Sequence, residues 1–199
     1  MLDSLADEAS IQAYLDSIPY SADPIYRGPA SVARDQKAHC FDGAVFAAAA
    51  LRRLGHRPLI IDLRAVRDDD HVLALFWRDG GLGAISKSNV STLRFREPLF
   101  RTPRELVLSY FDFYYNLDGE KTLREYSRPV DLSRFDRLCW ETDDAAMETI
   151  AQHLDRVPHT KLLRPEQEAK LAPMDRRTFD AGLLGADYAG LYKPGGEKG

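Results

Sequence analysis

Cys40 and His71 are the two residues of this sequence whose types and positions best suit covalent chemistry. Cys40 directly precedes an alanine-rich run, so we expect it in the first turn of a helix. At that place unsatisfied backbone N–H groups and the helix dipole favour the thiolate, the nucleophilic form of cysteine. His71 stands where a strand is expected to begin, and histidine is a common base for a cysteine nucleophile. The pair predicts attack of a thiolate on a carbonyl carbon.

The elements that would position this pair are one buried helix and a group of strands. The helix has apolar residues on nearly every face, and it is followed by a glycine and a proline that stop it. The strands are recognised by β-branched and apolar runs on both sides of an Asp-Gly-Gly turn. In chain order we expect a helix over residues 40–54, strands over 59–63 and 71–77, a hairpin turn at 79–81 and a returning strand over 83–87.

Weaker patterns complete the secondary structure. They predict a helix over 10–17 capped by Ser10, a loop over 21–36 with a turn at 31–35, an edge strand near 94–98, a helix starting at Pro103 after the cap Thr102, a strand over 132–140 and a helix over 143–154. Together the elements predict an α+β fold, with the Cys40 helix on a small antiparallel sheet and additional C-terminal helices. We expect one domain over residues 1–160 and a polar extension over 161–199, partly disordered at 193–199.

The composition narrows the classes of partner and compartment. The chain has 199 residues, 44% of them hydrophobic, and 27 basic against 31 acidic residues give a net charge of −4. This balance gives no reason to expect nucleic acid or an anionic membrane as a partner. Two distant cysteines argue against a disulfide scaffold, and the N-terminus lacks the apolar core of a signal peptide. We therefore expect a cytoplasmic protein.

Residues 40–44, the helix end at 51–58, the strand at 59–63 and His71 together resemble the transglutaminase-like superfamily, which shares the papain-like arrangement. The resemblance covers roughly residues 26–89. It implies that Cys40 is the nucleophile of a thioester mechanism, that His71 is its base and that no metal or organic cofactor takes part. The implied substrate is a peptide or another amide. The Cys40 N–H would stabilise the oxyanion, with Gln36 or Tyr26 as a possible second donor.

The third catalytic residue is harder to assign. The family carries an aspartate on the strand after the histidine, but residues 83–89 contain no carboxylate. A three-residue turn at 79–81 pairs His71 with Asn89, whereas a two-residue turn pairs it with Ser88. We favour Asn89, because an amide oxygen can accept a hydrogen bond from the histidine ring. Lys87 in that position would disfavour the imidazolium and leave a changed chemistry or none.

Other readings of the same residues stay open. Cys40 could be an ordinary core residue, and the aspartates at 68–70 could bind a metal with His71, although no second ligand group has metal-binding spacing. The favoured function is a cysteine-dependent amidase, peptidase or acyltransferase. The alternative is a catalytically inactive domain of the same fold that binds a peptide or protein partner. The sequence leaves the substrate and the oligomeric state undetermined.

Overall fold

The computed structural model describes residues 2–192 and has an α+β fold built on one seven-stranded sheet. All strand pairings are antiparallel, in the order β4-β3-β2-β1-β5-β7, with β6 also paired to β1. The strands are β1 Leu59–Ala65, β2 His71–Arg78, β3 Gly81–Ile85, β4 Arg96–Phe100, β5 Leu123–Ser127, β6 Val130–Asp131 and β7 His159–Lys161. The α-helices are α1 Glu8–Ser17, α2 Pro29–Asp35, α3 Cys40–Arg53, α4 Pro103–Phe111, α5 Ala145–Arg156, α6 Pro165–Glu168 and α7 Arg176–Gly182.

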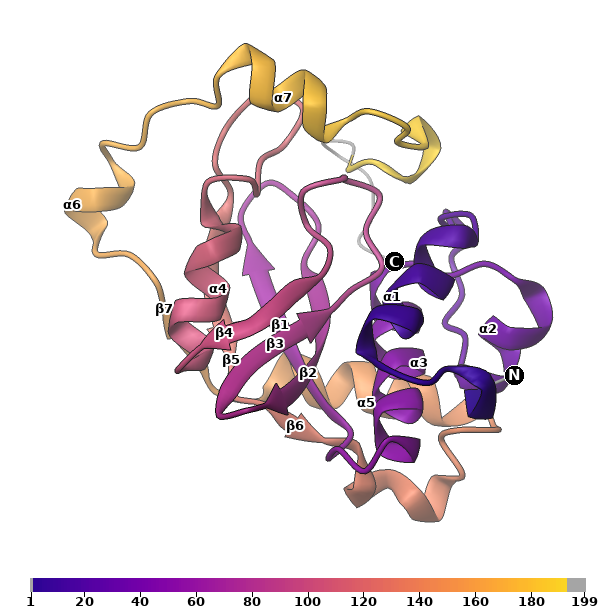
Figure 1. The fold of residues 1–199 in the computed structure, drawn as a ribbon. Coiled ribbons are helices and arrows are strands. Elements are labelled where there is room, and N and C mark those ends of the chain that lie inside the picture. Colours follow the sequence, from indigo (N-terminus) through magenta and orange to yellow (C-terminus); the bar gives the residue numbers. More distant parts are fainter. Residues whose placement is uncertain (1, 193–199) are drawn as a thin grey trace.

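Helices cover both faces of the sheet (Figure 1). On one face α3 packs against β2, and α1 and α5 pack around α3. Val72, Ala74 and Phe76 point into this layer, where the small side chains of α3 allow close approach. On the other face α4 covers the alternate residues of β2, such as Leu73 and Leu75. The sequence-based prediction of a cysteine helix on an antiparallel sheet is confirmed.

The helix that begins at Cys40 starts and ends close to its predicted bounds. His39 is its N-cap, and the side chain of Asp42 accepts a hydrogen bond from the His39 backbone, which completes a reciprocal cap. At the other end the backbone N–H of His56 bonds to the oxygen of Leu51, and Gly55 has a φ of 90°. A glycine takes this left-handed conformation without strain, so the chain can turn into β1.

Gly43 is the position where α3 approaches the segment after β3 most closely. A Cβ at Gly43 would overlap the Cβ of Lys87, whose ammonium group is held by the backbone oxygens of Leu15 and Ile18. We expect Gly43→Ala to lower the free energy of unfolding by about 1–2 kcal/mol, because overpacking outweighs the better helix propensity of alanine. Urea denaturation measures the change. A variant as stable as the unaltered chain would contradict this packing.

Outside the site, three predicted elements differ from the structure. The first helix starts at Glu8 with Asp7 as its N-cap, so Ser10 lies inside the helix as the reciprocal partner of that cap. The turn expected at 31–35 is the longer helix α2, with proline at its first position. The strand expected over 132–140 is a 3-10 helix, Leu132–Leu138, because the Asp131 side chain accepts from the Ser133 N–H and bends the chain there.

The C-terminal part continues beyond the sheet as an arm of short helices. α6 extends to one side, and α7 leads across the top of the sheet toward the N-terminal helices (Figure 1). A further 3-10 helix, Tyr188–Gly190, follows α7. The tail at 193–199, expected to be disordered, lies outside the described residues. No helix between residues 2 and 192 combines the length and apolar character needed to span a membrane.

Candidate functional site

Cys40 is the first residue of α3, half-buried, and lines a small cavity at the end of the sheet. Its thiol donates a 3.7 Å hydrogen bond to the backbone oxygen of Asp70. Burial raises the pKa of the Cys40 thiol to about 12, and the nearby Asp69 and Asp42 carboxyl groups add to the rise. A helix dipole changes a pKa by less than about one unit, whereas burial changes it by several. Burial therefore opposes the thiolate that the start of the helix was expected to favour.

Asp42 explains part of the unfavourable electrostatics at the start of α3. Its carboxyl group accepts hydrogen bonds from the backbone N–H groups of Arg27, at 2.8 Å, and His39, at 3.3 Å. Burial raises the pKa of Asp42 to about 7, although these two N–H groups oppose the rise. At neutral pH the group is therefore partly ionised. A negative charge two residues from Cys40 offsets the positive end of the helix dipole.

His71 is the first residue of β2, and its ring is buried on the α4 face of the sheet. The Nε2 atom lies 2.6 Å from Ser86 Oγ and 3.1 Å from the backbone oxygen of Leu93. Burial lowers the pKa of His71 to about 4, and the positive charge of Arg96 lowers it further, against the effect of the Leu93 oxygen. The imidazole is therefore neutral at pH 7.

The hydrogen bonds of the ring define its tautomer. The Leu93 oxygen can only accept, and it also accepts the hydroxyl proton of Ser86 at 3.1 Å. If Nε2 were unprotonated, two hydrogen-bond acceptors would face each other 3.1 Å apart, which is unfavourable. We therefore assign the proton to Nε2. The other ring nitrogen, Nδ1, then carries a lone pair. In a neutral histidine this is the nitrogen that can accept a proton.

Ser86 therefore stands beside His71 where Asn89 was expected. The turn between β2 and β3 is the two-residue Asp79-Gly80, with φ values of 53° and 79°, so the three-residue turn is wrong. The last residue pair between β2 and β3 is Ala74 with Ile85, after which β3 ends. One step further, Ser86 is the diagonal neighbour of His71 on the same face. The preference of Asp-Gly for two-residue turns was the sequence signal that could have indicated this register.

Gln12 holds the backbone of Ser86 in place. Its side-chain oxygen accepts from the Ser86 N–H at 3.0 Å, and its side-chain nitrogen donates to the Ser86 oxygen at 2.9 Å. This pair of buried hydrogen bonds replaces the strand pairing that β3 loses after Ile85. A residue of α1 thus positions the hydroxyl group that orients His71, and no local sequence pattern predicts that contact.

Among residues 2–192, none of the three candidates named from the sequence forms a hydrogen bond with the ring of His71, although Ser88 and Asn89 line the same cavity. Lys87 Nζ donates to the backbone oxygens at the end of α1, and burial lowers the pKa of Lys87 to about 8. Ser88 Oγ accepts from the Val90 N–H at 3.0 Å. Asn89 binds the backbone of Asp187, far along the chain. The expected pairing of Asn89 with His71 is wrong, because the pairing of β3 stops before this segment.

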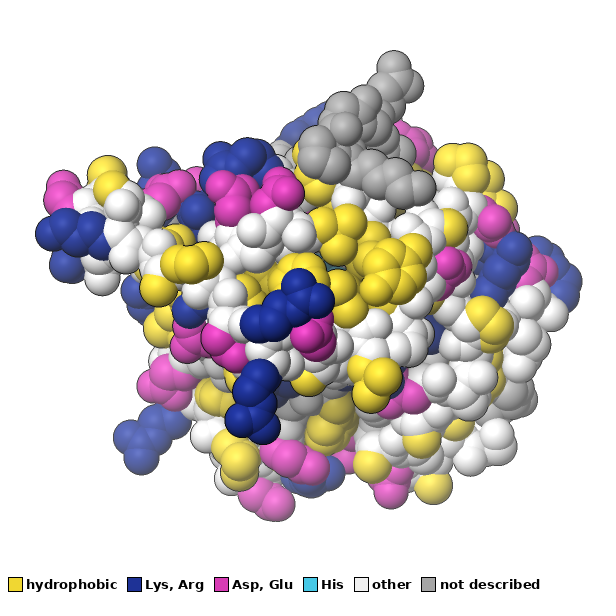
Figure 2. All heavy atoms as spheres, turned by 90° about the horizontal axis from the view of Figure 1, so that it is seen from above, with side chains coloured by type: hydrophobic (Ala, Val, Ile, Leu, Met, Phe, Trp, Pro, Cys, Tyr) yellow, Lys and Arg dark blue, Asp and Glu magenta, His cyan; other side chains and the backbone are white. Residues whose placement is uncertain are grey.

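Cys40 and His71 line the same cavity, of about 70 Å³. Residues 183–192, named here the C-terminal cover, contribute Leu183, Gly190, Leu191 and Tyr192 to its walls. Figure 2 looks down on this end, where hydrophobic side chains gather at the centre of the face. The volume admits a few water molecules, whereas ligand pockets usually measure several hundred Å³. Within residues 2–192, Cys40 Sγ makes its hydrogen bond to Asp70 and none to the His71 ring.

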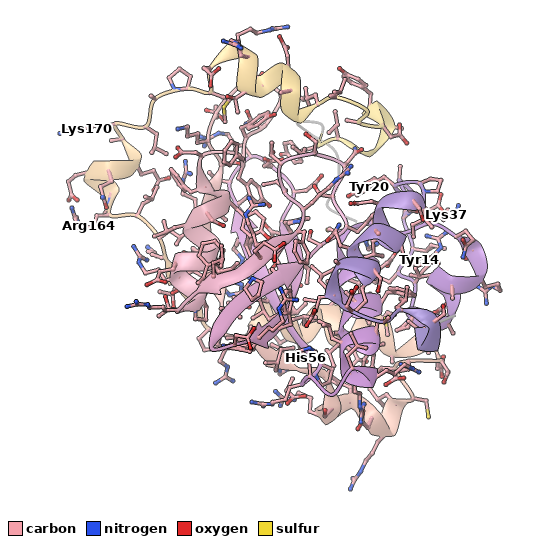
Figure 3. The ribbon with its side chains drawn as sticks, in the orientation of Figure 1. Tyr14, Tyr20, Lys37, His56, Arg164 and Lys170 are labelled. Carbon is pink, nitrogen blue, oxygen red and sulfur yellow. The ribbon has the colours of Figure 1, made fainter. Side chains whose placement is uncertain are left out.

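Tyr20 is a cavity residue that the sequence did not indicate. It lies on the side of the N-terminal layer nearest the C-terminal cover (Figure 3). Burial raises the pKa of the Tyr20 hydroxyl well above its ordinary value, and the backbone N–H of Cys40 acts in the opposite direction. Tyr20 thus faces the N–H expected to stabilise an oxyanion.

The two donors suggested from the sequence lie elsewhere. Gln36 donates to the Tyr14 hydroxyl at 2.9 Å, and the Tyr26 ring packs edge-on against His39. Neither lines the cavity.

Two of the three aspartates before His71 have structural roles. Asp68 accepts from the Thr122 hydroxyl at 2.7 Å, and Asp70 accepts from the Ala65 N–H at 2.8 Å. Burial raises the pKa of Asp68 to about 6. Among the residues that the structure describes, no three His, Cys, Asp or Glu side chains converge closely enough to hold a metal ion.

Comparison with known proteins does not assign this chain to a family. No family model matches the chain, and no curated protein matches it at a significant level of similarity. The fold and the cavity therefore carry the functional inference.

Proposed function

We propose that this chain is a transglutaminase-like cysteine hydrolase or acyltransferase that acts on a peptide or amide through a thioester at Cys40. The observation that carries the proposal is the shared cavity of Cys40 and His71. A cysteine at a helix start and a histidine at a strand start, 31 positions apart in the chain, both line this cavity. The chain order of α3, β1, β2 and β3 also agrees with the resemblance to that superfamily.

The proposed reaction has two steps. The Cys40 thiol passes its proton to Nδ1 of His71 while the sulfur attacks the substrate carbonyl carbon. The Cys40 N–H, together with Tyr20, stabilises the oxygen that becomes negative. The C–N bond then breaks, and Nδ1 returns its proton to the leaving nitrogen, which leaves a thioester. Water or an amine attacks the thioester and releases the thiol, giving hydrolysis or acyl transfer.

Ser86 takes the orienting role in this proposal. Its hydroxyl group and the Leu93 oxygen hold Nε2, so the ring presents Nδ1 as its basic nitrogen. A serine stabilises the imidazolium less than a carboxylate does, because it carries no charge. Burial lowers the pKa of His71 to about 4, and the serine supplies no charge to oppose this, so the histidine is a weak base. The thiol must also leave Asp70 before it can reach the ring.

Acylation by p-nitrophenyl acetate tests the proposal. We expect mass spectrometry to find one acetyl group on Cys40 of the full chain. The acetylation should be faster in Asn89→Ala, because this variant no longer holds Asp187. Cys40→Ser should abolish this adduct, and His71→Gln should slow its formation by about 100-fold or more, since it removes the base. Cys139→Ser is the matched control, because Cys139 is an exposed cysteine outside the cavity. If Cys40 is acylated at the same rate in His71→Gln as in the unaltered chain, the mechanism is contradicted.

A second function is favoured by one observation: in the described part of the chain, residues 2–192, the hydrogen-bond partners of the His71 ring are a hydroxyl group and a backbone oxygen, and no carboxylate is among them. A thiol with a pKa of about 12 beside an uncharged orienting residue is what a binding domain that has lost catalysis would carry. This alternative is an inactive transglutaminase-like domain that binds a peptide or protein. It predicts that no variant that opens the cavity forms the acetyl adduct on Cys40.

A further inference from the structure

The C-terminal cover buries few side chains, and Asn89 holds it by two hydrogen bonds to its backbone. From residue 163 to residue 192 the only buried residue is Gly182. Leu184 and Tyr188 are 79% and 65% exposed, so these large side chains add little hydrophobic stabilisation. A segment anchored in this way opens at a small fraction of the free energy of global unfolding. It can therefore leave the site while the rest of the chain stays folded.

Asn89 makes the principal polar contact to the cover. Its side-chain nitrogen donates to the backbone oxygen of Asp187 at 2.7 Å, and its side-chain oxygen accepts from the Asp187 N–H at 2.8 Å. Both bonds go to the main chain of one residue, so they do not select for its side chain. Gln12 binds the Ser86 backbone by the same pair of contacts. Asn89 is thus a main-chain clamp for a chain segment that crosses the cavity.

Gly190 marks where the cover passes closest to the site. A Cβ at this position would lie 2.8 Å from two ring carbons of Tyr20 and 3.2 Å from the Asn89 side-chain nitrogen. The distance of 2.8 Å is too short for a real Cβ contact and 3.2 Å is tight, so a larger residue must displace the segment or the side chains beside it. Tyr20 also lines the cavity of Cys40. The cover therefore passes close to Tyr20 and Asn89 beside the cavity of Cys40, and a residue larger than glycine would have to displace these side chains.

We infer that the C-terminal cover is an intramolecular occupant of a peptide-binding groove, clamped by Asn89 and gated by Tyr20, and that it blocks Cys40 until it is displaced. The incoming peptide takes the same clamp through its own main chain. It carries glycine where the cover places Gly190, three residues after the clamped residue. This inference deepens the proposed function by naming its substrate class and its regulation. The chemistry at Cys40 rests on the proposed function, whereas occupancy of the groove does not.

The first experiment compares Gly190→Val with Ala189→Val in the full chain. Ala189 is the adjacent small residue, and its side chain is exposed, so the second variant is a matched control. Alkylation of Cys40 by iodoacetamide is followed by mass spectrometry, with exposed Cys139 as the reference in the same molecule. We expect Gly190→Val to accelerate Cys40 alkylation about tenfold or more. This factor corresponds to the free energy lost when the two hydrogen bonds between Asn89 and the cover break. Ala189→Val should stay within about twofold.

Asn89→Ala is a second variant, which removes the clamp without adding bulk. It should also accelerate Cys40 alkylation, and an unfolding curve with an unchanged midpoint for the main transition shows that the sheet is intact. Equal rates of Cys40 alkylation in the unaltered chain, Gly190→Val and Asn89→Ala would overturn the inference that the cover blocks Cys40.

The second experiment tests peptide recognition in the Gly190→Val chain. A free decapeptide with the sequence of residues 183–192 should protect Cys40 from alkylation. The same decapeptide with valine in place of the glycine from position 190 should not. If neither peptide protects the thiol, or both protect it equally, the peptide groove is wrong.

These outcomes separate the groove from the chemistry. Protection by the decapeptide together with no acetyl adduct on Cys40 would sustain the groove and reject the thioester. An acetyl adduct that depends on His71, without protection by either peptide, would sustain the thioester and reject the groove.

Discussion

At neutral pH, Cys40 of the unaltered chain is expected to react with iodoacetamide about 100 times more slowly than an ordinary exposed thiol. Its pKa of about 12, against an ordinary 9.0, lowers the thiolate fraction by about three orders of magnitude. A thiolate of higher pKa is the better nucleophile, which recovers about half of that loss on a logarithmic scale. The proposed blocking by the cover, which lines the same cavity as Cys40, would slow the reaction further.

Exposed Cys139 of the same molecule serves as the internal reference for this measurement. In concentrated urea the two cysteines should react at similar rates, because unfolding removes both burial and cover. The rate at Cys40 should rise steadily with pH up to the limit of native stability, since its titration lies near pH 12. Fast labelling of Cys40 at pH 7 in the native chain would show that the thiol is already activated and uncovered.

Replacing Ser86 by aspartate is expected to raise the pKa of His71 by about two units or more. Ser86 Oγ lies 2.6 Å from Nε2, so a carboxylate at this position would stand in direct contact with the imidazolium. An opposite charge at such a distance raises a histidine pKa by about 1–3 units. Titration of the His71 ring by NMR, assigned with the His71→Gln variant, measures the change from about 4.

Ser86→Asn is the matched control, because asparagine has the shape of aspartate without its charge. It should leave the His71 pKa near that of the unaltered chain. Equal shifts in the aspartate and asparagine variants would mean that the effect comes from altered packing. No shift in either would place the ring away from residue 86.

The same substitution changes how stability depends on pH. In the unaltered chain the His71 pKa is about 4 when folded and 6.5 as an ordinary value, so the unfolded chain binds more protons between these limits. Stability is therefore lost as the pH falls from 6.5 to 4, by up to about 3 kcal/mol from this residue. In Ser86→Asp the two pKa values approach each other, and this contribution to acid sensitivity should largely disappear.

Local sequence signals predicted the part of the fold around the cysteine well. The apolar and alanine-rich pattern predicted α3, and the strands at 59–63 and 71–77 are present in β1 and β2. Predictions failed where a side chain competed with regular structure. Asp131 bends its segment into a 3-10 helix, and Asp7 caps α1 in place of Ser10.

Only two residues of the site were predictable from the sequence. Cys40 and His71 could be named because a helix start and a strand start have recognisable patterns. Ser86, Tyr20 and the cover could not be named with them. Their positions depend on where β3 stops pairing, on the clamp from Gln12 and on a contact between Asn89 and a residue 98 positions away.

The sequence by itself therefore determined which residues could do chemistry and which elements carry them, because hydrophobic periodicity and turn residues act over a few positions. The tertiary structure decided whether that chemistry is expressed. Burial, and not the helix dipole, sets the pKa of Cys40, since desolvation depends on everything packed around the thiol. Ser86 became the partner of His71 through a single residue of strand register, and segments from both ends of the chain close the cavity above them.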